Sequence, residues 1–115
     1  MSGLIPGKGE FITLGFDPDS VGHEQHGRRP ALVISRDAFN RETGMCVICP
    51  VTNARRDYPF HVPIPDGEPV AGVVMVDQVK SVDFRSRGVR RMGVASAALL
   101  GETLAKLDAC LYEPR

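Results

Sequence analysis

The feature of this sequence that most limits its fold is a series of short β-branched runs, separated by turn-forming residues, that continues to about residue 95. Such runs predict strands, because β-branched side chains favour the pleated backbone while Gly, Pro and Asn favour turns. The expected strands cover residues 10–16, 30–35, 45–52, 58–63, 70–76, 79–82 and 90–94. The prolines in 58–63 place that strand at a sheet edge. We therefore expect a mainly β protein, a small curled antiparallel barrel.

Helical features occur in two segments only. A short helix is expected over residues 36–43, ended by Gly44. A second helix begins at Ser96, where leucines recur at helical spacing: Leu100, Leu104, Leu107 and Leu111. This amphipathic pattern predicts one C-terminal helix added to the β domain.

The chain length of 115 residues fits one domain, expected to span residues 1–115 with a flexible start over 1–8. No apolar run approaches the roughly 20 residues of a membrane span, and the N-terminus lacks the pattern of an export signal. We therefore expect a cytoplasmic protein without membrane association. The three cysteines, an odd number, favour reduced thiols over a disulfide framework.

The formal net charge is zero, with 14 basic and 14 acidic residues, and this balance gives no sign of a generally basic nucleic-acid binder. The type of cation is more informative, since 11 of the 14 basic residues are Arg. A guanidinium binds a phosphate through two hydrogen bonds at once, so local arginine clusters matter more than the total charge.

Two short patterns suggest metal binding but do not support it. Cys46 and Cys49 have the spacing of half a zinc site, yet residues three apart in a strand point to opposite faces, and no second pair exists. We interpret them as packed core thiols. The string from His23 to His26 lacks the helical spacing of a metalloprotease motif. We expect no metal and no other cofactor.

A stronger signal is the pair of segments Arg28-Arg29-Pro30 and Pro50-Val51-Thr52, at the start of one strand and the end of another. If these strands are antiparallel neighbours, the start of one meets the end of the other. Arg29 and Thr52 would then face one pocket. Taken singly, each is equally compatible with a solvated loop edge or an ordinary strand end.

Eight segments of the chain, in order and at matching spacing, resemble the MazF toxin family. They are Phe16-Asp17-Pro18, Gly22-His23-Glu24-Gln25, Gly27-Arg28-Arg29-Pro30-Ala31-Leu32-Val33, Phe39-Asn40, Thr43-Gly44-Met45, Cys49-Pro50-Val51-Thr52, Tyr58-Pro59-Phe60 and Asp77-Gln78-Val79-Lys80-Ser81. The resemblance implies the CcdB/MazF fold, an SH3-like barrel with added helices. It further implies a homodimeric, sequence-specific endoribonuclease toxin that cleaves single-stranded messenger RNA and is neutralised by a MazE-like antitoxin.

The resemblance also implies site residues. Arg29 and Thr52 match the family's catalytic positions. Glu24 matches the family's acidic residue in a loop associated with RNA binding, and we add it to the catalytic residues as a candidate general base. RNA contacts are expected from neighbouring polar and basic residues: His23, Gln25, His26, Arg28, Asn53, Arg55, Arg56, Asp77, Gln78 and Lys80. In the related PemK branch an Arg stands two positions before the Asp that matches Asp77, whereas this chain has Met75. Family members often have an aromatic and an acidic residue in the first strand, where this chain has Leu14 and Gly15.

The expected chemistry is attack of a ribose 2′-OH on its own phosphate, which leaves a 2′,3′-cyclic phosphate or 3′-phosphate and a 5′-OH. The crowded phosphate needs positive charge, which Arg29 supplies, and Thr52 donates a hydrogen bond. Glu24 is the first candidate for the general base, with His23, His26 and Asp77 as alternatives. His61, on the expected edge strand, is interpreted as structural. The sequence does not indicate which bases are recognised.

Two other functions fit a barrel of this type. One is a CcdB-like toxin that inhibits DNA gyrase by protein contact, and the other is an inactive barrel that only binds antitoxin. The pair Arg29 and Thr52 argues against both, because a pure binding module does not need these groups beside Glu24.

Overall fold

A computed structural model describes residues 4–15, 28–54 and 58–112 of the chain. Its strands are β1 (Glu10–Gly15), β2 (Arg28–Val33), β3 (Met45–Thr52), β4 (His61–Pro63), β5 (Val73–Met75), β6 (Lys80–Asp83) and β7 (Arg90–Val94). Two α-helices, α1 (Asp37–Thr43) and α2 (Ala97–Leu111), and the 3-10 turns η2 (Val76–Gln78) and η3 (Phe84–Ser86) complete the described elements. The predicted mainly β fold with a C-terminal helix is confirmed.

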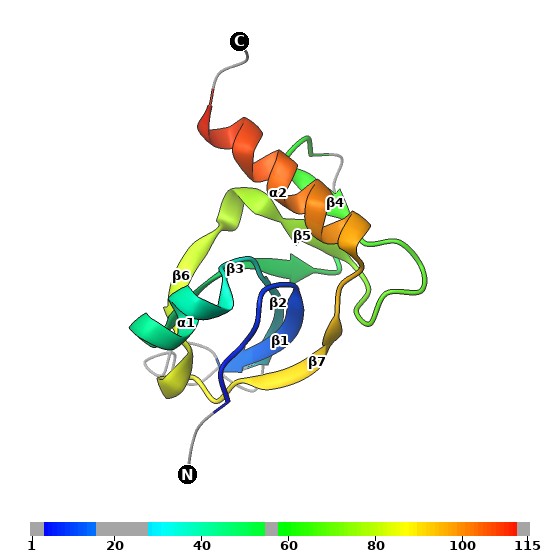
Figure 1. Ribbon diagram of the computed structural model, residues 1–115. Coiled ribbons are helices and arrows are strands. Elements are labelled where there is room, and N and C mark those ends of the chain that lie inside the picture. Colours follow the sequence, from blue (N-terminus) through cyan, green and yellow to red (C-terminus); the bar gives the residue numbers. More distant parts are fainter. Residues whose placement is uncertain (1–3, 16–27, 55–57, 113–115) are drawn as a thin grey trace, which may run out of the picture.

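The strands form one curled antiparallel sheet in the order β4-β5-β3-β2-β1-β7, and β6 also pairs with β3. Figure 1 shows the sheet bending around its own interior, with β7 beside β1 and α2 lying across β4 and β5. Within the described part of the chain, β4 and β7 stand at opposite ends of this order and do not pair, so the barrel is open. As the prolines predicted, β4 lies at an edge of the sheet.

Both faces of the central strands are buried. Phe11 and Leu32 belong to a core cluster that α2 covers through Leu99, while their neighbours Ile12 and Val33 belong to a second cluster on the other face. All four side chains are fully buried. This burial on both faces explains why β1 and β2 lack the alternation of apolar and polar residues that is typical of a strand with one solvent-exposed face.

Helix α2 begins where Ser96 predicts it, since the Ser96 hydroxyl accepts the backbone N–H of Leu99 at 3.1 Å. Leu100, Leu104 and Leu107 pack against the core, but Leu111 is 65% exposed because the helix extends past the sheet there. The buried face instead includes Leu99 and Thr103, one helical turn apart. No helix among the described residues is long and apolar enough to span a membrane.

The segment before β1 is anchored. Pro6 is fully buried and its carbonyl accepts a hydrogen bond from the amide of Asn40 at 2.8 Å. The backbone N–H of Lys8 is bonded to Asp37 at 2.9 Å. A flexible start was expected over residues 1–8, of which residues 1–3 lie outside the described residues; Pro6 and Lys8 are instead held in place, because the short helix α1 supplies polar partners that the sequence pattern did not reveal.

Candidate functional site

Strands β2 and β3 bring Arg29 and Thr52 together. Their antiparallel register pairs Leu32 with Cys49 and Ala31 with Pro50, and two further residues along each strand lead to Arg29 and Thr52. Both side chains line a pocket of about 280 Å³, together with Arg28 and Asn53. We call this the Arg28 pocket.

The backbone around Thr52 orients its hydroxyl. Thr52 is the last residue of β3, and its oxygen Oγ1 accepts the N–H of Ala54 at 3.1 Å. This bond leaves the hydroxyl hydrogen to donate elsewhere. Gly72 passes so close to the carbonyl oxygen of Thr52 that a Cβ there would lie 2.4 Å from it. Only glycine permits this approach.

Two further pockets adjoin the first. The Arg87 pocket, of about 200 Å³, shares Arg29 and Pro30 with the Arg28 pocket. The Asp77 pocket, of about 290 Å³, shares Thr52 with the Arg28 pocket and Met75 and Gln78 with the Arg87 pocket. We refer to the three together as the Thr52 groove.

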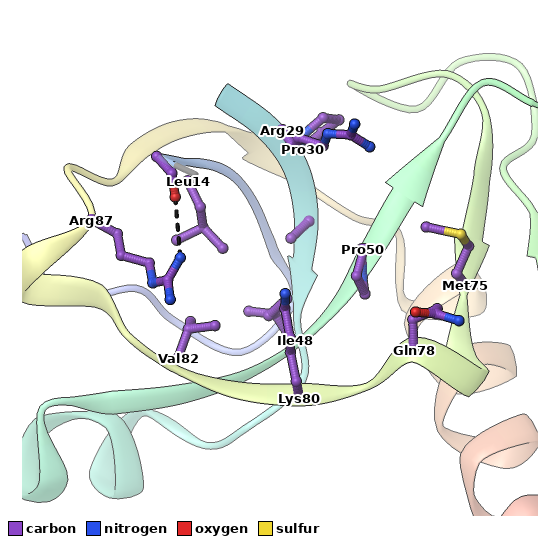
Figure 2. A pocket seen from close by; sticks show the side chains of 12 residues that line it. Leu14, Arg29, Pro30, Ile48, Pro50, Met75, Gln78, Lys80, Val82 and Arg87 are labelled. Atoms are coloured by element: carbon purple, nitrogen blue, oxygen red, sulfur yellow. Dashed lines mark hydrogen bonds between the residues drawn. The ribbon is translucent and has the colours of Figure 1, made fainter. Parts of the chain in front are cut away.

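The Arg87 pocket has an apolar floor and a cationic rim. In Figure 2, Arg29, Lys80 and Arg87 stand around a floor that includes Ile48 and Pro50. The Arg87 guanidinium donates to the carbonyl oxygen of Gly15 at 3.4 Å, which directs the side chain across the pocket. This combination suits a polyanion with flat groups that bind to the apolar floor and phosphates that bind to the cationic rim.

Charge is unevenly distributed in the groove. Its described lining contains four basic side chains, Arg28, Arg29, Lys80 and Arg87, against the single carboxylate of Asp77. The Arg28 side chain is held in place by the fold, because its guanidinium donates to Thr13 Oγ1 at 2.9 Å and also to the carbonyl oxygen of Gly88. The groove is therefore locally cationic although the formal net charge is zero.

Asp77 has two neighbours in its pocket. Its Oδ1 lies 3.2 Å from Nε2 of His61, and its Oδ2 lies 3.5 Å from the amide nitrogen of Gln78. The His61 side chain is only 8% exposed, whereas that of Asp77 is 27% exposed. The ring of Tyr58 meets the His61 ring edge-on, with centroids 4.8 Å apart.

The predicted site residues divide into two sets. The structure brings seven of them to the Thr52 groove: Arg28, Arg29, Thr52, Asn53, Asp77, Gln78 and Lys80. The other six lie outside the described residues: His23, Glu24, Gln25, His26, Arg55 and Arg56. Three polar residues of the groove, Tyr58, His61 and Arg87, were not among the predicted site residues. Arg87 belongs to the arginine-rich segment 85–91, a composition typical of contacts with an RNA backbone, but nothing in the sequence pairs His61 with Asp77.

The two strand cysteines face opposite cores. Cys46 packs in one core cluster and Cys49 in the other, as alternation along β3 requires. Burial raises the pKa of Cys46 to about 11, and burial, with smaller effects from Cys110 and Asp77, raises that of Cys49 to about 12. Such thiols are poor metal ligands. Among the described residues, no group of three or more His, Cys, Asp and Glu side chains is placed to hold a metal.

The fold and the groove define a class: a small open β-barrel with a cationic, apolar-floored groove at the ends of β2 and β3. A family model described as the PemK-like, MazF-like toxin of type II toxin-antitoxin systems matches residues 7–111. The chain belongs to this family. The resemblance inferred from the sequence motifs is thereby confirmed.

Relatives from Escherichia coli K12 match nearly end to end. The endoribonuclease toxin MazF is 39% identical over 108 residues, which cover 94% of this chain and 96% of that protein. The endoribonuclease toxin ChpB is 43% identical over 108 residues, or 89% and 90% of the two chains.

Solved structures agree with the fold. MazF of Deinococcus radiodurans superposes with a TM-score of 0.82 at 43% identity, covering 95% of this chain and 98% of that one. A MazE-MazF structure from the same organism gives a TM-score of 0.85 at 41% identity, covering 94% and 97%. The predicted CcdB/MazF type of barrel is thereby confirmed.

Proposed function

We propose that this chain is a cytoplasmic, metal-independent endoribonuclease toxin that cleaves single-stranded messenger RNA at the Thr52 groove. The observation that supports this most directly is the shared pocket of Arg29 and Thr52, beside the cationic rim of Lys80 and Arg87. The names of the E. coli relatives, both endoribonuclease toxins, support the same activity.

Arg29 stabilises the reacting phosphate. When a ribose 2′-OH attacks its own phosphate, negative charge accumulates on the phosphoryl oxygens, and a fixed guanidinium compensates it. Arginine stays protonated at neutral pH, so this is its main task. Thr52 donates its hydroxyl hydrogen to one phosphoryl oxygen, since its oxygen already accepts from Ala54. As the 2′-oxygen bonds to phosphorus, the bond from phosphorus to the 5′-oxygen breaks, and the departing 5′-oxygen takes up a proton from water or from Arg29. The products are a 5′-OH and a 2′,3′-cyclic phosphate, which a water molecule can open to a 3′-phosphate.

The general base is Glu24, with His23, His26 and Asp77 as the alternatives. Of these, Asp77 alone belongs to the described residues, where it lines the same pocket as Thr52. Mutation of each candidate, with the pH dependence of cleavage, separates them, because the true base controls the acidic limb of the rate profile.

The deciding experiment is incubation of the purified protein with a long RNA in EDTA. We expect cuts at a few short sequences and 5′-OH ends. Arg29→Ala should lower the rate by about 10²- to 10³-fold, as loss of one preorganised charge-stabilising donor does. Arg41→Ala, at an exposed arginine of α1 outside the groove, is the matched control. Intact RNA with the wild-type protein would contradict the proposal.

We also propose that a MazE-like antitoxin and a second copy of this chain are the protein partners. Solved relatives are titled as MazE-MazF complexes, which supports the antitoxin. We expect an acidic antitoxin segment with apolar anchors to occupy the groove and block Arg29, because the groove combines cations with an apolar floor. Antitoxin that binds without slowing RNA cleavage contradicts this arrangement. Light scattering that shows only monomer at micromolar concentration contradicts the homodimer.

A further inference from the structure

We infer that Asp77 selects the nucleobase bound beside the cut site, favouring bases with an exocyclic amino group, and that His61 positions its carboxylate for this task. The inference rests on the proposed RNA cleavage and adds a specificity determinant to it. It arises from a contact that the sequence did not reveal, the 3.2 Å approach of His61 Nε2 to Asp77 Oδ1.

His61 holds the carboxylate from the buried side. The ring lies at the start of β4, where His61 pairs with Met75 of β5, and Asp77 follows two residues later in η2. With 8% of its side chain exposed, His61 has little freedom to move. Nε2 must bear a hydrogen to donate to a carboxylate, and it does so in both the neutral Nε2–H tautomer and the cation. The contact therefore holds in either form.

The carboxylate of Asp77 has acceptor positions that His61 and Gln78 do not use, and its side chain lines the pocket. A carboxylate accepts about four hydrogen bonds, and His61 and Gln78 supply one donor to each oxygen. The side chain is 27% exposed and lines the pocket that contains Thr52. A ligand that displaces water from these lone pairs binds best when it donates hydrogens of its own to them.

Nucleobases differ in the hydrogens they offer. Cytosine, adenine and guanine each have an exocyclic amino group, whereas uracil offers one ring N–H between two carbonyl oxygens that repel a carboxylate. Asp77 therefore discriminates against uracil. Tyr58, 46% exposed at the same pocket, offers a ring face on which an unstacked base can lie. The volume of about 290 Å³ is sufficient for one base.

The test maps cut sites in a random RNA pool by sequencing the 5′-OH fragments from matched variants. Wild type should disfavour uracil at one position near the cut. Asp77→Asn presents an amide hydrogen to the pocket, and this hydrogen can be donated to a carbonyl oxygen of uracil. The ratio of cleavage with uracil to cleavage with the other bases at that position should rise by about ten-fold, the discrimination that one good base contact provides. Asp66→Asn makes the same chemical change at an exposed turn outside the groove and should keep the wild-type pattern.

His61 is tested by loss and rescue. His61→Leu keeps the bulk but removes the donor, and should flatten the preference at the same single position. His61→Gln places an amide N–H near the position of Nε2 and should restore the preference, although it lacks the ring contact with Tyr58. Thermal unfolding of each variant checks that the fold is retained, and a purely structural role of His61 would not change one position of the cut site selectively.

The outcomes separate the two proposals. Failure of the wild type to cut any RNA contradicts the proposed function and this inference with it. Cleavage by the wild type, with unchanged base preference in Asp77→Asn and His61→Leu, overturns the inference alone. Equal loss of cleavage at all sequences in Asp77→Asn also overturns it, because that result makes Asp77 a catalytic group.

Discussion

The role of the Thr52 hydroxyl in RNA cleavage can be tested by two conservative substitutions. Thr52→Val keeps the shape but removes the donor to the phosphate, a charged hydrogen bond worth about 1.5–3 kcal/mol, together with the oxygen that accepts from Ala54. We expect cleavage to slow by about 10- to 100-fold. Thr52→Ser keeps the oxygen that accepts from Ala54 and the hydrogen that it donates. Initial rates on one defined oligonucleotide measure both, and equal activity of wild type and Thr52→Val would exclude Thr52 from the chemistry.

Some side chains of the site and core follow from local rules that the sequence alone contains. Alternation along β3 placed Cys46 and Cys49 on opposite faces, and antiparallel register placed Arg29 opposite Thr52. The contact of His61 with Asp77 was missed because it joins an edge strand to a 3-10 turn. No spacing rule relates two such elements.

At the level of elements, the approach of Gly72 to β3 fixes the end of the strand that bears Thr52. Gly72 has φ +126°, and an added Cβ would meet the Thr52 carbonyl oxygen at 2.4 Å. Gly72→Ala should therefore reduce both the free energy of unfolding and the cleavage rate, because backbone atoms must shift at the site.

Gly67→Ala is the matched control for this change. Gly67 also has a positive φ, +96°, but a Cβ there meets nothing within 4 Å. Gly67→Ala should lower the free energy of unfolding by about 1–3 kcal/mol through backbone strain, without affecting cleavage by the folded protein. Urea unfolding and cleavage rates on both variants measure the difference. Equal losses of activity would show that strain alone explains the effect at Gly72.

The elements themselves were predicted with uneven success. β3 and β7 have the predicted ends, since turn-forming residues flank both, whereas β4 and β5 are shorter than the runs of β-branched residues suggested. Those short strands end because neighbouring segments, including η2, turn away from the sheet. The leucine period of α2 marked its packed face but extended one turn too far, to the exposed Leu111. How far a helix extends past its sheet is a tertiary property.

For the whole molecule, the buried thiols link stability to alkaline pH. Thiols of the unfolded chain have their ordinary pKa of 9.0, while burial raises the pKa of Cys46 to about 11 and of Cys49 to about 12. Above pH 9 the unfolded chain thus loses protons that the folded chain retains. Stability from these thiols is complete below pH 9 and falls as the pH rises through 11–12.

The measurement is urea unfolding at several pH values from 8 to 12. The double variant Cys46→Ala and Cys49→Ala should be less stable at neutral pH because of the cavities, but its stability should decline less steeply above pH 9. Cys110→Ala removes an exposed thiol whose effect on the pKa of Cys49 is smaller than that of burial, and should change the alkaline slope less than the double variant does. A double variant with an unchanged alkaline slope contradicts the assignment.

The charge distribution of the whole molecule predicts salt-dependent RNA binding despite a net charge of zero. Each cation that contacts a phosphate of single-stranded RNA contributes about 0.7 to the slope of log affinity against log salt concentration. Lys80 lines the groove, so Lys80→Ala should weaken binding of a non-cleavable 2′-O-methyl RNA and reduce this slope by about 0.7. Lys8→Ala, at an exposed lysine outside the groove, should change neither quantity. If Lys8→Ala and Lys80→Ala lower the slope equally, the RNA follows the general surface and not the Thr52 groove.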